Sequence, residues 1–131
     1  MSDQTTWDAL RDAVARYFDL MFDADVTRFD DVFAPSAQLH GLSDGQLRLL
    51  RAQDYKAALA SGSSPKAKHA PRRQEILLMD IASATQAVVK VRVRIDALLY
   101  LDYLAYHRIG GMWLITAKSF HVEERYDTSA A

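Results

Sequence analysis

The fold is decided by residues 98–122, LLYLDYLAYHRIGGMWLITAKSFHV. Two runs rich in aromatic and β-branched residues flank Gly110-Gly111, a dipeptide typical of two-residue hairpin turns. The pattern predicts antiparallel strands over residues 98–109 and 112–122. A regular hairpin sets Ile109 opposite Met112 and Tyr103 opposite Lys118, and it leaves one row of side chains on each face of the sheet.

The segments around this hairpin complete an α+β pattern. Residues 76–81 and 88–96 predict two further strands, the second with clear alternation of apolar and polar residues, and residues 37–42 predict a short one. Apolar residues at steps of three and four predict a helix that begins near Trp7 and includes Met21. A short helix over 26–33 stops before Pro35, and a third helix covers 52–60, whereas residues 46–51 fit neither pattern clearly.

This order of elements predicts one α+β domain over residues 1–131, with frayed ends at 1–4 and 124–131. The N-terminal helices pack on one face of a curved, mainly antiparallel sheet. Residues 61–73, SGSSPKAKHAPRR, form a loop, and a loop of this length favours a functional role or mobility.

Composition excludes several classes of function. Sixteen Lys and Arg residues balance 17 Asp and Glu residues, so the chain lacks the basic surface expected of a nucleic-acid-binding protein. There is no cysteine, and no pair of histidines has the spacing of a metal site, so we expect neither metal nor cofactor. No apolar run approaches the roughly 20 residues that span a bilayer, and the first residues are not a secretory signal. We expect a cytoplasmic protein that does not bind membranes.

Three stretches together resemble the nuclear transport factor 2-like superfamily, which includes SnoaL-like polyketide cyclases and steroid isomerases. They are residues 15–25 (ARYFDLMFDAD), 33–41 (FAPSAQLHG) and 102–120 (DYLAYHRIGGMWLITAKSF). The similarity is greatest to the branch described as "putative lumazine-binding". The resemblance implies a cone-shaped α+β barrel around a pocket, and pairing of two copies through the outer face of the sheet.

The resemblance also implies which pocket groups are present. Steroid isomerases of the superfamily use a helix tyrosine, a carboxylate base on the first strand and a protonated acid on a late strand. Tyr17 matches the tyrosine of these enzymes. Gly41 occupies the position of the base and Ala105 that of the second acid, and neither residue can transfer a proton, so isomerase chemistry of that kind is not expected. Because the resemblance matches Ala105 to a pocket residue, we expect the face of the hairpin that carries Ala105 to line the pocket. Asp102 lies on the opposite face, so we expect it to point outward, toward Arg92 or Arg94. The predicted ligand-binding residues are Tyr17, Met21, Phe33, Leu39, Tyr55, Leu101, Tyr103, His107, Lys118 and Phe120.

Three functions fit these residues. The first is a small-molecule-binding protein for a hydrophobic or aromatic ligand, without a catalytic acid–base set. The second is a cyclase, dehydratase or isomerase of an aromatic or polycyclic substrate, with Tyr17, Tyr103, Lys118 and His107 as its polar groups. The third is a non-catalytic dimeric interaction domain. Lys118 and Tyr17 also fit purely structural roles, as a lysine that covers the sheet and a core tyrosine. The homodimer would use an outer row formed by Leu104, Tyr106, Trp113, Ile115 and Ala117.

Overall fold

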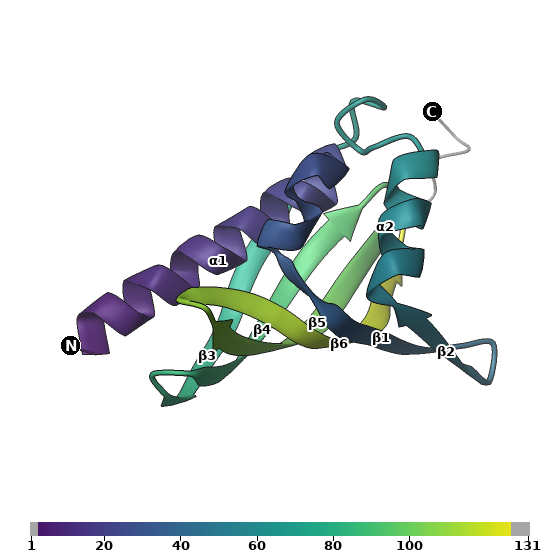
Figure 1. Ribbon diagram of the computed structural model, residues 1–131. Helices are drawn as coiled ribbons and strands as arrows, with labels where there is room; N and C mark the ends of the chain where they lie inside the picture. Colours follow the sequence, from purple (N-terminus) through teal and green to yellow (C-terminus); the bar gives the residue numbers. More distant parts are fainter. Residues whose placement is uncertain (1–2, 127–131) are drawn as a thin grey trace.

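The computed structural model describes residues 3–126 and confirms the predicted α+β architecture. Helix α1 and strand β6 extend into the ends expected to fray, while residues 1–2 and 127–131 lie outside the described part. In chain order the elements are α1 (Asp3–Asp23), the 3-10 helix η1 (Val26–Asp31), β1 (Phe33–Ser43), β2 (Gln46–Arg51), α2 (Ala52–Ser61), β3 (Gln74–Ser83), β4 (Gln86–Ile95), β5 (Leu98–Ile109) and β6 (Met112–Arg125) (Figure 1).

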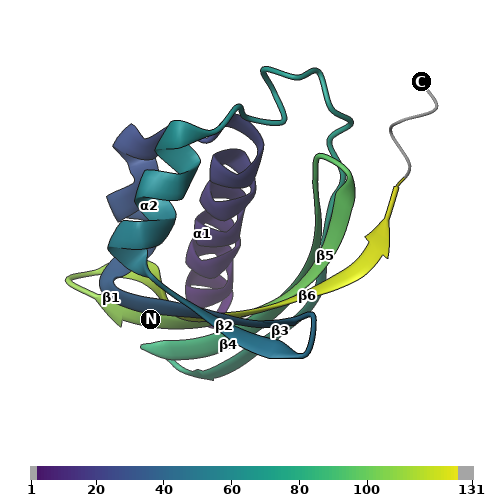
Figure 2. The same cartoon turned by 90° about the vertical axis from the view of Figure 1, so that its right-hand side faces the viewer.

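The strands form one mixed sheet in the order β2-β1-β6-β5-β4-β3. Only β1 and β6 run parallel among the described strands, and every other neighbouring pair is antiparallel. The sheet curves strongly, and α1 and α2 both lie on its concave side (Figure 2). The segment 46–51, which the sequence pattern left unassigned, pairs with β1 as a hairpin closed at Asp44-Gly45. Within the described residues, no helix combines the length and apolar character that crossing a bilayer requires.

The core lies between α1 and the concave face of the sheet. One face of α1 is almost completely buried, because its apolar residues recur at helical spacing. Alternate residues of β4 meet it from the sheet, and the residues between them face outward. The buried side chains of this contact include Leu10, Val14, Met21, Val89, Val91 and Leu104.

A β-bulge at Thr116 breaks the predicted hairpin register. Tyr106 lies opposite Ile115, as the Gly-Gly turn requires, but Ala105 lies opposite Ala117, so Thr116 is the extra residue. The Thr116 hydroxyl donates to the carbonyl oxygen of Ala105 (3.4 Å) and lies 2.6 Å from Nδ1 of His107. Residues 117–122 of β6 therefore pair one position later than predicted, and a second irregularity shifts Glu124 and Arg125 by one more.

Two of our predictions about the sheet were wrong, and the bulge accounts for the first of them. Lys118 lies opposite Leu104, not Tyr103. The row predicted to pair two copies is buried on the concave side, with the exception of the exposed Ala117: Leu104, Tyr106, Trp113 and Ile115. The outer face instead exposes a different apolar set, formed by Leu42, Leu47, Leu49, Leu78, Val88 and Tyr103.

Gly41 generates a prediction, because a β-carbon at this position would overlap the ring of Phe120. We expect Gly41→Ala to lower the free energy of unfolding by about 1–3 kcal/mol, the usual cost of overpacking. Urea unfolding followed by circular dichroism measures the change. Phe120→Leu introduced with Gly41→Ala should recover part of the loss.

Gly62→Ala is the matched control for this substitution. Its nearest neighbour would be the carbonyl oxygen of Ala58 at 3.7 Å, an ordinary contact, so we expect little change or a small gain in stability. Equal stability of the Gly41→Ala and Gly62→Ala proteins would contradict the tight packing of Phe120 on Gly41.

Candidate functional site

A cavity of about 330 Å³ opens between α2, the loop that follows α2 and the concave face of the sheet. Its walls are mainly apolar, and they come from segments that are far apart in the sequence. Met21 comes from the end of α1 and Ala24 follows the helix, and the others come from β1, β2, α2, the loop after α2, the β4–β5 turn, β5 and β6. The lining residues are Met21, Ala24, Leu39, Leu50, Tyr55, Ala58, Leu59, Gly62, Ser63, Ser64, Pro65, Ile95, Asp96, Tyr100, Lys118 and Phe120.

Half of the residues predicted for ligand binding line this cavity: Met21, Leu39, Tyr55, Lys118 and Phe120. Tyr17 and Phe33 are buried in the core behind it, and their rings form an edge-to-face pair. Leu101, Tyr103 and His107 lie on the outer face, so their prediction as lining residues was wrong. The error follows from the match of Ala105 to a pocket residue, because the other face of β5 is the concave one; the bulge in β6 is the reason that Lys118 and Phe120 line the cavity all the same.

Lys118 is the cationic group of the cavity, and only 4% of its surface is exposed. Its Nζ lies 3.8 Å from a carboxylate oxygen of Asp102 and 3.5 Å from the hydroxyl of Tyr55. The same nitrogen lies 5.0 Å from the ring centre of Tyr17 and 5.1 Å from that of Tyr55. These contacts are all longer than a strong charge-assisted hydrogen bond, so the ammonium retains donor capacity toward the cavity.

Asp102 is fully buried beside Lys118, which corrects the prediction that it points outward. The Tyr17 hydroxyl donates to its Oδ2 at 2.6 Å, and its Oδ1 has no hydrogen-bond partner among the described residues. Arg92, a predicted partner of Asp102, binds Glu123 at 2.7 Å on the outer face. Asp102 therefore joins α1 to β5 and provides the counter-charge of Lys118.

The protonation states follow from this burial. Burial raises the pKa of Tyr17, and the negative charge of Asp102 raises it further, so this phenol remains a neutral donor. Burial alone would lower the pKa of Lys118, but Tyr55 and Asp102 outweigh it and the pKa is raised on balance. At neutral pH the site therefore holds an ammonium rather than a neutral amine.

The remaining polar groups of the cavity lie toward its opening. Asp96, in the turn between β4 and β5, has a positive φ of 55° and binds Lys68 at 3.0 Å. Ser63, Ser64 and Tyr100 complete this polar part of the lining. Burial raises the pKa of Tyr100, so its hydroxyl is neutral. The sequence patterns did not predict any of these four residues as part of the site. The length of the loop over residues 61–73, which contains Ser63 and Ser64, was the one indication of a functional role there.

The structure pairs Tyr17 with a different acid from the one that the resemblance implied. Its hydroxyl donates to Asp102, whereas the resemblance placed the second acid at the position of Ala105. At the base position, the Phe120 ring occupies the space that a side chain on Gly41 would need. The described residues contain no cluster of acids and histidines suited to a metal ion. The cavity can thus donate a hydrogen bond from Lys118, but Gly41 provides no carboxylate at the position that the resemblance assigned to the base.

The buried charge pair generates the next prediction. Lys118→Met leaves the Asp102 carboxylate without a counter-charge, and breaking a buried pair in this way typically costs about 3–5 kcal/mol. Adding Asp102→Asn removes the stranded charge and should restore most of the stability. Guanidinium unfolding of the single and double variants measures both effects.

Lys90→Met provides the control, because Lys90 is a cation on the outer face, over the ring of Tyr103. We expect it to change the free energy of unfolding by less than about 1 kcal/mol. If the loss of unfolding free energy in the double variant equalled the sum of the losses in the Lys118→Met and Asp102→Asn single variants, the pairing of Lys118 with Asp102 would be refuted.

Comparison with known proteins agrees with this fold. The family model described as "Putative lumazine-binding" matches residues 5–121. A protein from Silicibacter pomeroyi described as NTF-2 like and of unknown function is 18% identical, with a TM-score of 0.83 over 94% of this chain and 100% of that one. A similar protein from Shewanella baltica is 19% identical, with a TM-score of 0.80 over 94% and 98% of the two chains.

A ketosteroid isomerase-like protein from Erwinia carotovora is 12% identical, with a TM-score of 0.69 over 89% of this chain and 95% of that one. No curated protein matches the chain. At these identities the solved structures establish the fold alone. Because the family model covers most of the sequence, the chain belongs to the "putative lumazine-binding" family, with the nuclear transport factor 2-like fold.

Proposed function

We propose that the protein binds a small, planar, mainly apolar molecule in this cavity, with an acceptor atom of the ligand on Nζ of Lys118. The observation that carries the proposal is a buried ammonium that lines an apolar cavity and has only long contacts with the protein. Buried polar groups are normally hydrogen-bonded. An acceptor from a ligand would give Lys118 a shorter hydrogen bond than those to the hydroxyl of Tyr55, at 3.5 Å, and the Sδ of Met21, at 3.8 Å.

The walls favour a ring system. Tyr100 and Phe120 meet edge to face at 6.3 Å on the sheet side, and Tyr55 faces them from α2. Aromatic and aliphatic walls with a few convergent polar groups are typical of small-molecule sites, and about 330 Å³ lies at the lower end of their usual size. A single ring or a fused bicyclic compound fits this volume better than a tetracyclic steroid.

The local charge favours a neutral ligand. Asp102 lies behind Lys118 and compensates its charge, so an anionic ligand would add an uncompensated charge to a buried site. A carbonyl oxygen of a lactam, imide, enone or quinone accepts a hydrogen bond without that cost. Lumazine, which the family description names, is a planar bicyclic compound with two carbonyl groups and has this chemistry.

The enzymatic alternative retains one supporting observation, the buried network of Tyr17, Asp102 and Lys118. Such a network can stabilise negative charge that develops on a carbonyl oxygen. Tyr103 and His107, which the sequence added to this hypothesis, lie on the outer face and cannot contact the same ligand. Product formation from a bound enone or ketone during the binding experiment would favour this alternative.

A panel of lumazine, riboflavin, aromatic ketones and their carboxylate analogues tests the proposal by thermal shift and calorimetry. We expect saturable binding of neutral carbonyl compounds and weaker binding of the carboxylates. Ala58→Trp, at the exposed edge of the cavity, should block binding. The Lys118→Met/Asp102→Asn protein should bind the same carbonyl compound about tenfold or more weakly, through the loss of a charge-assisted hydrogen bond.

Ala60→Trp is the matched control, because Ala60 is exposed on the same helix but does not line the cavity. The Ala60→Trp protein should bind the carbonyl compound with the same affinity as the unmodified chain. If Ala58→Trp and Ala60→Trp bind the ligand equally well, the cavity is not the binding site.

We also propose that two copies pair through the outer face of the sheet. This face exposes Leu49, Leu78 and Tyr103, with Lys90 and the Arg92–Glu123 pair beside them. Exposed apolar surface of this kind is typical of interfaces, and the helices cover only the concave side (Figure 2). Because the face carries both signs of charge, a copy related by a twofold axis can pair its charges with this one.

Size-exclusion chromatography with light scattering should give a particle of two chain masses at micromolar concentration. Tyr103→Glu places a charge on the outer face and should shift the mass toward one chain. Trp7→Glu, on an exposed part of α1, should leave it unchanged. A particle of one chain mass for the unmodified protein would end the dimer proposal.

A further inference from the structure

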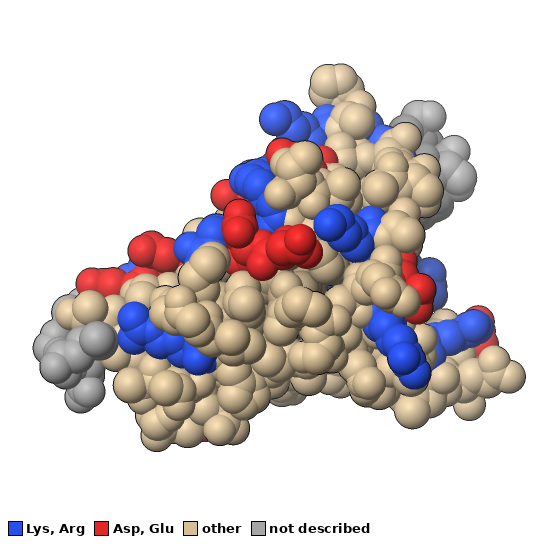
Figure 3. All heavy atoms as spheres, viewed as in Figure 1, with Lys and Arg blue, Asp and Glu red and all other residues tan. Residues whose placement is uncertain are grey.

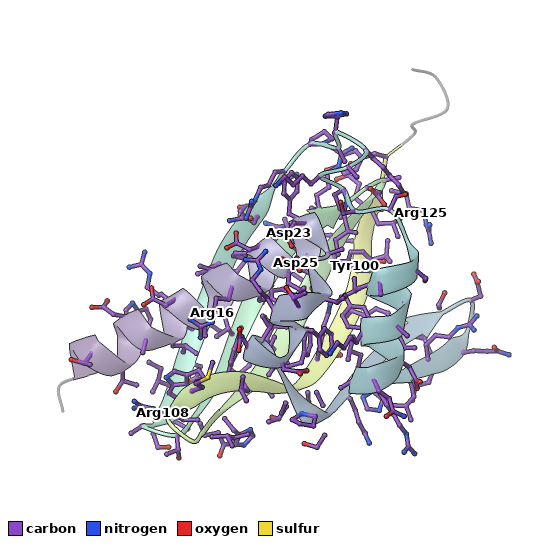
Figure 4. All side chains as sticks on the ribbon, turned by 45° about the horizontal axis from the view of Figure 1, so that its top comes forward. Arg16, Asp23, Asp25, Tyr100, Arg108 and Arg125 are labelled. Carbon is purple, nitrogen blue, oxygen red and sulfur yellow. The ribbon has the colours of Figure 1, made fainter. Side chains whose placement is uncertain are left out.

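Residues 62–70, which we call the crossing loop, span the opening of the cavity from one wall to another. The first four of them line the cavity, and Lys68 then contacts Asp96 of the β4–β5 turn, which is also a lining residue. The loop lies at the top of the molecule in Figure 1, and Figure 2 shows it between α2 and the sheet. Tyr100 of the cavity wall is labelled beside α2 in Figure 4, which brings this end forward.

The crossing loop is a compact unit with hydrogen bonds of its own. The amide of Ala67 donates to the Ser64 hydroxyl at 3.0 Å, and the amide of Lys68 donates to the Ser64 carbonyl oxygen at 3.1 Å. A third bond runs from the amide of Ala70 to the carbonyl oxygen of Pro65 at 2.9 Å. Because all three bonds lie within the loop, it can move as one body and keep its backbone groups paired.

Few polar contacts hold the crossing loop to other segments. Among the described residues there are two: the Lys66 amide donates to the carbonyl oxygen of Phe22 at 3.0 Å, and Nζ of Lys68 lies 3.0 Å from Oδ2 of Asp96. The side chains of Lys68 and Asp96 are 51% and 35% exposed. An ion pair with this exposure contributes little to stability, so it can break and form again readily.

The chain is held firmly again just beyond the crossing loop. Basic side chains appear beside the loop at the top of the molecule in Figure 3. One of the basic residues that follow it, Arg72, binds Asp19 of α1 at 2.7 Å and lies over the ring of Phe22 at 4.8 Å. The carbonyl oxygen of Arg73 accepts from the amide of Arg94 at 2.9 Å. The loop is therefore anchored at both ends, by α2 and by residues 72–73, and joined weakly in between.

Backbone conformation marks the same contact. Asp96 has a φ of 55°, and His69, next to Lys68, has a φ of 57°. Positive φ is uncommon for residues other than glycine, and such residues cluster at switch regions. Both sides of the Lys68–Asp96 contact thus carry a conformation that the surrounding structure has to maintain.

The inner end of the cavity is nearly closed to solvent. Lys118 is 4% exposed and Leu39 is 1% exposed, although both line the cavity. A ring that contacts Lys118 is therefore largely enclosed by the chain. Most of the remaining wall consists of helices and strands, which their backbone hydrogen bonds hold in place, so the crossing loop is the part of the wall best able to move aside.

We propose that the crossing loop is a lid, which moves away from the β4–β5 turn when the Lys68–Asp96 ion pair breaks and so controls access to the cavity. The lid turns about its two anchored ends and keeps its internal hydrogen bonds. This inference rests on the proposed function, because a lid has a role only over a cavity that takes up a ligand.

The chain contains no cysteine, so a single thiol can report access to the cavity. In Leu39→Cys, the thiol replaces a buried lining side chain and should react with 4,4′-dithiodipyridine, a neutral aromatic disulfide, when the lid opens. We expect Asp96→Asn and Lys68→Met to accelerate this reaction about two- to fivefold, the contribution of a partly exposed ion pair. The two substitutions together should give the same rate as either one alone, because both remove the same contact.

Salt provides an independent check of the ion pair. Sodium chloride at about 0.5 M reduces the Debye length to about 4 Å and should accelerate the reaction of Leu39→Cys. It should have little effect once Asp96→Asn is present. Lys90→Met, which removes a cation from the outer face, should leave the rate unchanged.

Val91→Cys is the control for unfolding of the whole chain, because Val91 is buried in the core and does not line the cavity. Its thiol should react at least about tenfold more slowly than that of Leu39→Cys, since only global unfolding exposes it.

Amide hydrogen exchange followed by NMR tests the movement without a cysteine or a ligand. Asp96→Asn should raise the exchange rate of the Lys66 amide about two- to fivefold, because this amide leaves Phe22 when the lid opens. The amides of Lys68 and Ala70 bond within the lid and should keep their rates.

Three results would each overturn the lid: an unchanged rate of Leu39→Cys on addition of Asp96→Asn, equal rates for Leu39→Cys and Val91→Cys, or a Lys66 amide that does not respond. If the lid opens as expected but no compound of the carbonyl panel binds, the lid is supported and the proposed function fails. If a carbonyl compound binds while Asp96→Asn changes neither measurement, the proposed function stands and the lid fails.

Discussion

The buried carboxylate of Asp102 is the constraint on which the interior of this protein depends. It accepts a hydrogen bond from Tyr17 on α1 and lies 3.8 Å from the ammonium of Lys118 on β6. A carboxylate without exposure is tolerated only when other groups compensate its charge. A hydrogen bond and a charge pair therefore hold α1, β5 and β6 in one arrangement, in addition to the packing of their apolar side chains. The same pairing keeps Lys118 charged at the inner wall of the cavity, where a ligand would meet it.

The bulge at Thr116 makes this pairing possible. In a regular hairpin continued from Gly110-Gly111, Ser119 and not Lys118 would share the face of Asp102. One extra residue in β6 moves Lys118 and Phe120 to the concave side without moving Trp113 or Ile115 away from it. Bulges are frequent next to functional sites because they redirect side chains in this way. Here the redirected residues are an ammonium and an aromatic wall of the same cavity.

Gly41 and Phe120 together define what the cavity can do. Phe120 fills the space that a side chain at position 41 would need, so this packing requires glycine there. The resulting cavity has donors at its inner wall and apolar walls around them. Its opening is bordered by residues 62–65, and the Lys68–Asp96 ion pair joins the following part of the loop to the β4–β5 turn. This distribution suits recognition of a neutral carbonyl compound better than removal of a proton from it.

The sequence by itself determined the elements and their class. Helical spacing in α1, alternation in β4 and the Gly-Gly turn are local signals, and each one predicted its element correctly. Met21, Leu39, Tyr55, Lys118 and Phe120 were also identified as cavity residues from these patterns and from the resemblance to the superfamily. Only the tertiary structure decided which residues of β5 face inward. A bulge depends on the hydrogen bonds that one extra residue finds across the strands, and here Thr116 finds them with Ala105 and His107. Alternation cannot show such an insertion, because threonine fits a regular strand equally well. The match of Ala105 to a pocket residue placed Tyr103 inside and Asp102 outside, and without the bulge nothing in the hairpin pattern showed that Lys118 and Tyr103 lie on opposite faces. The folded chain buries Asp102 beside Tyr17 and Lys118.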